Sequence, residues 1–210
     1  MIYYLWDFKP NETNNFLKFN QKVVEHNQKF IPNYTLISPN DTDKILESFP
    51  EMKDLYLKIN DWIVQTDLIR LLVIYLNGGM YCDIDCFLKR KIPQDKNVVL
   101  FVESICPNVD TLGPRESKHP ENRVRIANYC FVSKNKKHAF FKDVIDECVK
   151  RLKQLFLVEK VTKMSYHDIL WCCGPDVITS VYHRVKKKYP DIFLSNGSHL
   201  EHRNYGSWKN

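Results

Sequence analysis

Apolar positions follow the period of a helix in some segments of the chain and that of a strand in others. Residues 61–77 carry apolar side chains around most of a helix, and the glycine pair 78–79 ends it, so a well-buried helix is expected there. Residues 80–85 follow at once with the composition of a strand. The same reasoning predicts strands at 1–6, 34–38, 98–102 and 124–133, and helices at 13–30, after 39–41, at 139–156 and from 176 to about 188.

The alternation of strands and helices indicates an α/β layered fold. The chain has 210 residues and shows no repeat, low-complexity tract or Gly/Ser linker, so residues 1–210 are expected to form a single domain. The segment 105–123 is polar with several prolines and is expected to be a mobile surface loop. A hydrophobic fraction of 44% rules out collagen, coiled-coil and wholly disordered classes.

Net charge, cysteine spacing and the lack of long apolar runs indicate which ligands and which compartment to expect. The net charge of +6 suits a phosphorylated ligand without requiring one. The seven cysteines show no zinc-binding spacing and are interpreted as reduced, mostly buried thiols. No run approaches the roughly 20 apolar residues of a membrane span, and the start lacks the features of a signal peptide. We therefore expect no transmembrane segment and a cytoplasmic or cytosol-like compartment.

The first candidate for chemistry is Asp83-Ile84-Asp85. Residues two apart in a strand face the same side, so both carboxylates are expected to project together from a strand end. Such a pair suits Mg²⁺ or Mn²⁺ with a diphosphate completing the coordination. The pattern is weak alone, because Asp41-Thr42-Asp43 has the same form and is interpreted as helix capping.

The second candidate is the pair Asp67 and Arg70, one turn apart on the long helix that precedes the carboxylates. One interpretation is an ordinary intrahelical ion pair worth a few tenths of a kcal/mol. The alternative is a functional pair, since burying both charges in an apolar helix is costly unless they are used or well bonded.

The run 66–70 (TDLIR) followed by 75–85 (YLNGGMYCDID) resembles the signature of DXD-motif sugar transferases of the glycosyltransferase family 32 type. These are related to yeast-type initiating mannosyltransferases and to the glucosylating domain of large clostridial toxins. Further segments resemble the same family: 4–6 (YLW), Asn128 before 130–133, 174–176 (GPD) and 206–208 (GSW). The sequence departs from the family at Cys173, which stands where the family's turn has Thr.

The resemblance implies a GT-A fold, which is a single Rossmann-like open mixed sheet flanked by helices. It also implies a nucleotide-sugar donor, Mn²⁺ (or Mg²⁺) and transfer with retention of configuration. Asp67, Arg70 and Asp85 would be the catalytic residues. The residues expected to contact the nucleotide-sugar are Leu5, Trp6, Asp67, Arg70, Tyr81, Asp83, Ile84, Asn128, Ser207 and Trp208.

The resemblance also implies the metal ligands. Asp85 would bind the metal directly, and Asp83 would reach the ribose or a metal-bound water. His199, Glu201 and His202 are candidates for a third ligand, and we choose His202 because its spacing to Trp208 resembles the family best. The Trp6 side chain would lie against the nucleotide base, although an aromatic residue in a first strand is usually part of the core.

The sequence therefore predicts a metal-dependent transferase that moves a hexose from a nucleotide-sugar to a glycan or protein hydroxyl. A UDP-sugar is the preferred donor, and GDP-mannose is the second candidate. The alternative is a non-catalytic nucleotide-sugar or nucleic-acid binding module on the same fold. A nucleic-acid partner is not expected, because no recognised motif is present. A phosphohydrolase is disfavoured, since its Asp-x-Asp pair would follow an early strand rather than a long helix.

Overall fold

A computed structural model describes residues 1–10 and 15–203. Its strands are β1 (Ile2–Leu5), β2 (Tyr34–Ile37), β3 (Gly79–Cys82), β4 (Cys86–Leu88), β5 (Val98–Ile105), β6 (Val124–Ser133), β7 (Ile192–Ser195) and β8 (Leu200–His202). Its helices are α1 (Phe16–Gln28), α2 (Thr42–Leu46), α3 (Pro50–Tyr56), α4 (Trp62–Asn77), α5 (Ala139–Lys153), α6 (Tyr166–Cys172) and α7 (Pro175–Val185). Short 3-10 helices lie at Pro39–Asp41, Val109–Thr111 and Pro120–Arg123, and a π-helical turn at Gln154–Val158 continues α5.

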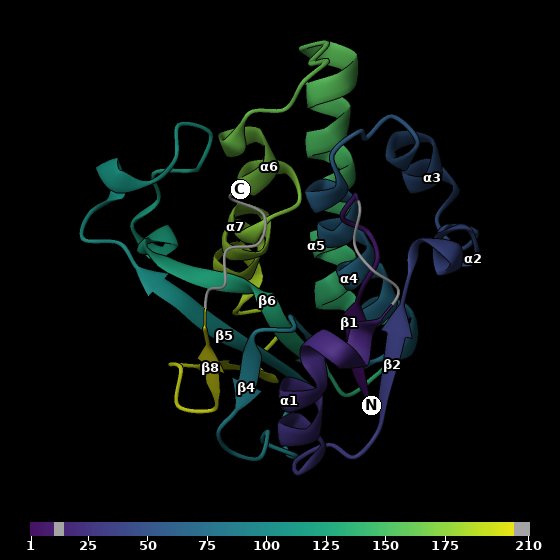
Figure 1. Ribbon diagram of the computed structural model, residues 1–210. Coiled ribbons are helices and arrows are strands. Elements are labelled where there is room, and N and C mark those ends of the chain that lie inside the picture. Colours follow the sequence, from purple (N-terminus) through teal and green to yellow (C-terminus); the bar gives the residue numbers. More distant parts are fainter. Residues whose placement is uncertain (11–14, 204–210) are drawn as a thin grey trace.

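The main sheet is mixed, with strand order β2-β1-β3-β6-β5-β7 (Figure 1). Strand β1 lies between β2 and β3 and is parallel to both, whereas β6 is antiparallel to β3 and β5. Strands β4 and β8 form a separate antiparallel ribbon. Because β6 runs antiparallel to its neighbours, it begins at the end of the sheet at which β1, β3 and β5 finish.

Two hydrophobic clusters cover the two faces of this sheet. Tyr81 and Phe131 belong to the cluster formed with α4, α5, α6 and α7. Met80 and Cys130, which are their strand neighbours, belong to the cluster formed with α1 and the β4–β8 ribbon. Figure 1 shows α1 and this ribbon together on one side of the molecule. The alternation along each strand is the physical basis of the layered fold.

Two glycines join α4 to β3. Gly78 has a φ of 66° and ends the helix, and Gly79 has a φ of 87°. A Cβ at Gly79 would lie 2.9 Å from the Met1 carbonyl oxygen, so only glycine lets β3 run this close to the start of β1. The sequence predicted this joint, and it fixes the position of the Asp-x-Asp segment relative to α4.

The structure corrects the prediction of one strand over residues 80–85. Strand β3 ends at Cys82, and Asp83-Ile84-Asp85 forms a turn before β4, in which the Cys86 amide donates to the Asp83 carbonyl at 3.1 Å. The argument that both carboxylates share one face of a strand was therefore wrong. They are brought to the same place by a turn that redirects the chain into the β4–β8 ribbon.

Several short elements were not predicted, namely α3, β4, α6, β7 and β8. The segment 105–123, expected to be a mobile surface loop, contains the last residue of β5 and two 3-10 helices. Each missed element is three to seven residues long, which is too short for a clear hydrophobic period. No helix in the described ranges is long and apolar enough to cross a membrane.

Candidate functional site

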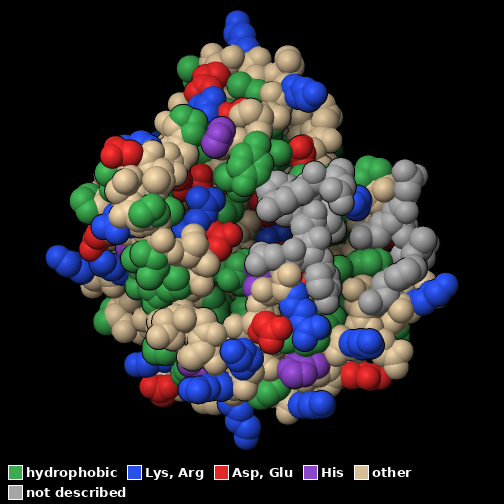
Figure 2. Space-filling view, turned by 60° about the vertical axis from the view of Figure 1, so that its left-hand side comes forward, with side chains coloured by type: hydrophobic (Ala, Val, Ile, Leu, Met, Phe, Trp, Pro, Cys, Tyr) green, Lys and Arg blue, Asp and Glu red, His purple; other side chains and the backbone are tan. Residues whose placement is uncertain are grey.

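A cavity of about 550 Å³ opens where β1, β3 and β5 end and β6 begins. It is lined by residues of β1 and the turn after it, α4, the Asp-x-Asp turn, β5, β6, β8, α6 and α7. Figure 2 shows acidic and basic side chains together in a hollow bordered by hydrophobic ones. A concave site with a few converging polar groups is the usual form of a ligand pocket.

Asp67 and Arg70 lie on the wall of the cavity that α4 provides. The Arg70 Nη2 atom is 3.1 Å from Asp67 Oδ1, which also accepts a hydrogen bond of 2.9 Å from the Asn128 side-chain amide. Burial raises the pKa of Asp67 to about 7, against the opposing effect of Arg70. The pair is not a surface ion pair, because both side chains are buried and both are hydrogen-bonded to Asn128 of β6.

The same arginine reaches the Asp-x-Asp turn. Its guanidinium lies 4.8 Å from the centre of the Tyr81 ring, and Nη1 is 3.7 Å from Asp83 Oδ1. The Tyr81 hydroxyl donates to the same Asp83 oxygen. Burial raises the pKa of Asp83, while Arg70 acts in the opposite direction. The Asp83 carboxylate is therefore directed toward α4 rather than toward β8.

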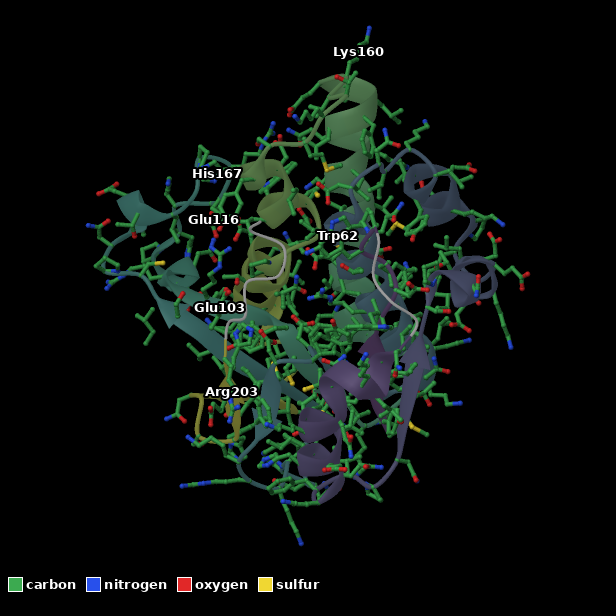
Figure 3. The ribbon with its side chains drawn as sticks, viewed as in Figure 1. Trp62, Glu103, Glu116, Lys160, His167 and Arg203 are labelled. Carbon is green, nitrogen blue, oxygen red and sulfur yellow. The ribbon has the colours of Figure 1, made fainter. Side chains whose placement is uncertain are left out.

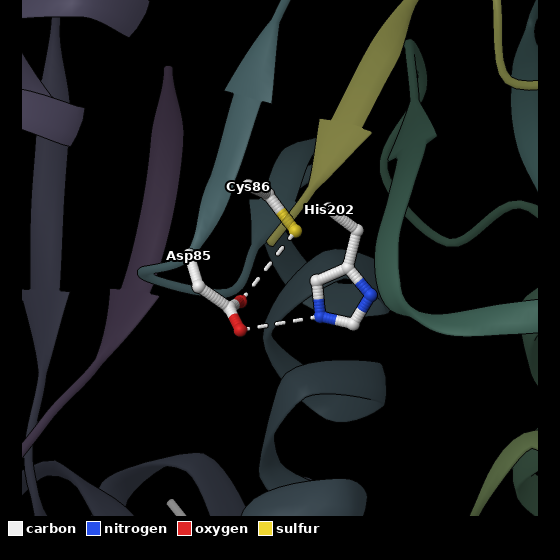
Figure 4. A group of neighbouring side chains, drawn as sticks. All are labelled: Asp85, Cys86 and His202. Carbon is white, nitrogen blue, oxygen red and sulfur yellow. Dashed lines mark hydrogen bonds and ion pairs between the residues drawn. The ribbon is translucent and has the colours of Figure 1, made fainter. Parts of the chain in front are cut away.

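Asp85 faces the other way, toward the β4–β8 ribbon (Figure 4). Its Oδ2 atom is 3.3 Å from His202 Nε2, and the Cys86 thiol lies 3.9 Å from its Oδ1. The pairing of Cys86 with His202 in the ribbon accounts for this meeting of distant residues. The His202 ring also stacks on Tyr129, with centres 3.8 Å apart.

Within the described ranges, Asp85, Cys86 and His202 are the residues found grouped closely enough to hold a metal ion, with ligand atoms within 4.8 Å of one another. A carboxylate and an imidazole form a donor set that Mn²⁺ accepts, and the Cys86 thiol would add a softer ligand. Burial alone lowers the pKa of His202, but its hydrogen bond to Asp85 raises it above its ordinary value. Asp85 and His202, two of the three predicted ligands, thus lie together beside Cys86, whereas Asp83 lies beside Arg70 and its role as a ligand stays a prediction.

The other predicted site residues divide into two groups. Leu5, Trp6, Ile84 and Asn128 line the same cavity, and the Trp6 ring packs edge-on against Phe16 at 5.4 Å. Ser207 and Trp208 lie outside the described residues. Of the other candidates for the third ligand, His199 accepts or donates at Ser195 and Ser198, and Glu201 contacts Arg203.

Sequence reasoning missed a second charged wall of the cavity. Glu103 and Arg125 line it, and Arg125 also contacts Glu116 and Asp176 behind the surface. Tyr166 of α6 lines the same cavity. These residues come from segments far apart in sequence and form no motif; the one available signal was the charged residues in the otherwise apolar strands 98–105 and 124–133.

Comparisons with known proteins agree with this geometry. Residues 10–116, just over half of the chain, match the family model described as a glycosyltransferase sugar-binding region containing a DXD motif. The structure titled "PaToxG Glycosyltransferase" is similar with a TM-score of 0.55 and 18% sequence identity, over 87% of this chain and 68% of that chain. At this identity the likeness shows the fold, which is GT-A. No curated protein matches.

Proposed function

Because the chain belongs to the family of glycosyltransferase sugar-binding regions that contain a DXD motif, we propose that it is a metal-dependent hexosyltransferase with a nucleotide-sugar donor. The donor is a UDP-sugar, with GDP-mannose as the second choice, and the acceptor is the hydroxyl of a glycan or another molecule. Transfer retains the configuration at the anomeric carbon. Residues 1–210 act as one catalytic domain.

One observation carries this proposal: the cavity holds both the Asp67–Arg70 pair and the Asp85–His202 pair. The first pair offers a carboxylate and a guanidinium to sugar hydroxyls. The second pair offers a carboxylate and an imidazole to a divalent cation. A sugar diphosphate needs both kinds of contact within the length of one molecule.

Asp85 and His202 would hold Mn²⁺ or Mg²⁺, which when bound offsets the negative charge that develops on the departing diphosphate. The chain's own residues do the positioning. Asp67 accepts hydrogen bonds from the donor sugar, and Arg70, fixed by two backbone carbonyls, keeps Asp67 and Asp83 in place. Trp6 and Leu5, at the end of β1, contact the nucleotide base.

The cavity itself contributes by limiting water. Its α4 and α6 sides carry apolar side chains, including Trp62, Ile63 and Ile169. A bound sugar with little water around it reacts with the acceptor rather than with water. The predicted contact of Ser207 and Trp208 with the diphosphate would extend this effect and stays a prediction.

The experiment is a thermal-shift measurement with UDP, GDP, UDP-glucose, UDP-galactose, UDP-N-acetylglucosamine and GDP-mannose, each with and without Mn²⁺. A ligand at 100 times its Kd adds about 2.7 kcal/mol. For a chain of this length, that raises Tm by roughly 5–10 °C. We expect a shift that requires metal and is larger for uridine than for guanosine. No shift with any nucleotide would favour a non-catalytic relative of the fold.

Asp85→Asn sharpens this test. The amide keeps the shape of the side chain but loses the charge, so we expect transfer to fall by about 10²–10³-fold and the metal-dependent shift to vanish. The matched control is Asp43→Asn in the chain's other Asp-x-Asp segment, where Asp43 is exposed and pairs with Lys53. Full activity of Asp85→Asn with metal present would refute the assignment.

A further inference from the structure

The second charged wall of the cavity is built around Arg125. Its Nε lies 2.7 Å from Glu103 Oε2, its Nη1 3.4 Å from Glu116 Oε1 and its Nη2 2.5 Å from Asp176 Oδ1. Glu116 and Asp176 are almost fully buried, whereas the Glu103 side chain is 32% exposed. Figure 3 shows Glu103 and Glu116 on the β5 side of the molecule and Trp62 across from them at the start of α4.

Charge on this wall is negative. Three carboxylates surround one guanidinium, and burial raises the pKa of Asp176 to about 8, so this group is mostly protonated at neutral pH. Glu103 and Glu116 are the other two carboxylates around this one cation; burial raises the pKa of Glu103, and Arg125 acts in the opposite direction. Because each nitrogen of the Arg125 guanidinium already faces a carboxylate, much of its positive charge is offset before a phosphate or carboxylate ligand arrives.

Glu103 has bonding capacity left over. Arg125 occupies its Oε2 atom, and within residues 1–10 and 15–203 no hydrogen bond or ion pair is found at Oε1. A carboxylate oxygen held by an arginine on one side accepts hydrogen bonds on the other without moving. The half-exposed Tyr166 ring and the Tyr129 ring line the same cavity, and aromatic faces are common in pockets for compact ligands.

The wall is also close to the reacting end of the donor site. Tyr129 of β6 stacks on His202, which pairs with Asp85. Glu103 lines the same cavity, and its charge acts on His202. A hydroxyl bound at Glu103 would therefore share one cavity with the Asp85–His202 pair.

We propose that Glu103 and Tyr166 form the acceptor subsite and that it takes the hydroxyls of a neutral sugar, with Arg125 as the residue that positions Glu103. This inference rests on the proposed function. In the transfer, the bond between the anomeric carbon and the diphosphate oxygen breaks. The bond from that carbon to the acceptor oxygen forms, and the hydroxyl proton leaves with the diphosphate. Glu103 aligns the acceptor and takes no proton.

The experiment measures transfer and hydrolysis together. The protein is incubated with Mn²⁺ and the nucleotide-sugar that gives the largest thermal shift, and each acceptor is added in turn. The probes are the methyl glycosides of glucose, galactose, mannose and N-acetylglucosamine, beside methyl glucuronide and glucose 6-phosphate. We expect neutral glycosides to give roughly tenfold more product than the two anionic sugars, since like charges repel at the wall. Comparable or higher yields with the anionic sugars would overturn the proposal.

The diagnostic variant is Glu103→Gln. A carboxylate that accepts hydrogen bonds from sugar hydroxyls binds the sugar less well when it is replaced by an amide. The ratio of transfer to hydrolysis should therefore fall by roughly tenfold or more. The matched control is Glu121→Gln, whose carboxylate pairs with Lys186 outside the cavity and whose ratio should equal that of the wild type. An unchanged ratio in Glu103→Gln would contradict the inference, as would transfer only to a hydroxyl-bearing peptide.

A binding measurement separates this inference from the proposed function. Saturation-transfer NMR of the methyl glycosides on the wild-type protein, without donor, should detect a signal that Glu103→Gln weakens. If no nucleotide-sugar is cleaved yet the signal is present and Glu103-dependent, the proposed function fails and the sugar subsite stands. If no glycoside binds, the subsite fails whatever the donor result. Tyr166→Ala tests the same wall should Glu103→Gln not fold.

Discussion

Two clusters with one arginine each line the same cavity, and they differ in how the chain assembles them. Arg70 lies in the middle of α4 and meets Asp67 one turn earlier and Asp83 just after the next strand. Arg125 lies near the start of β6 and meets Glu103, Glu116 and Asp176 from three separate segments. The first cluster is local in sequence, and the second exists only in the folded chain.

The clusters also differ in their backbone contacts. Arg70 donates to the carbonyls of Thr66 and Asn128, at 3.3 and 2.9 Å, and so ties α4 to β6. In the described part of the chain, the Arg125 guanidinium contacts side chains, those of Glu103, Glu116 and Asp176, and no backbone carbonyl. We therefore expect the Arg70 cluster to contribute more to the stability of the fold than the Arg125 cluster.

The largest expected effect contrasts the two arginines. Arg70→Leu leaves the buried Asp67 with the Asn128 amide but without its countercharge, and leaves the Asn128 carbonyl without the guanidinium, so we expect a loss of about 3–5 kcal/mol in the free energy of unfolding. Arg125→Leu removes three ion pairs, but Glu103 is partly exposed and Asp176 is already mostly protonated, so we expect about 1–3 kcal/mol. Urea unfolding of both variants measures the difference.

A count of ion pairs predicts the opposite order for these variants, because Arg125 has three and Arg70 has two. A larger loss for Arg125→Leu would show that the second cluster carries more of the fold than its exposure suggests. The expected order of the two contributions to stability would then be wrong.

The same contrast explains what could be predicted from the sequence. The signature at 66–85 predicted the family, and the family match confirms it. Its position beside the Gly78–Gly79 joint predicted that α4 leads directly into the carboxylates. The turn at 83–85 was missed, since nothing in the run indicates that β3 stops at Cys82. Non-local pairs such as Asp85 with His202 need the register of β4 with β8, and only the resemblance pointed to His202.

The second prediction concerns the joint that places the first cluster. Gly79→Ala would put a Cβ 2.9 Å from the Met1 carbonyl oxygen at a φ of 87°. Backbone strain and the clash together should cost about 1–3 kcal/mol and lower donor affinity by moving the Asp-x-Asp turn. Gly197→Ala is the matched control, because it has a φ of 89° but nothing within 4 Å of the added Cβ. Equal losses of stability in the two variants would show that strain alone acts at Gly79.

The smallest expected effect separates the clusters by pH. Burial raises the pKa of Asp67 to about 7 and that of Asp176 to about 8, from an ordinary value of 3.8 for both. The folded chain therefore binds more protons than the unfolded chain over this range. The stability that each group adds is present at acidic pH and is lost as the pH rises to its folded pKa.

Asparagine mimics the protonated carboxyl, so each Asp→Asn variant should flatten the part of the stability curve that its group controls. A single group contributes a slope of at most about 1.4 kcal/mol per pH unit. Between pH 5 and 7, both Asp67→Asn and Asp176→Asn should reduce the fall in stability. Between pH 7 and 8, Asp176→Asn alone should do so, because Asp67 has already lost its proton in the folded chain. Urea unfolding at pH 5, 6, 7 and 8 measures these slopes, and identical curves for the two variants above pH 7 would mean that the clusters titrate as one unit across the cavity.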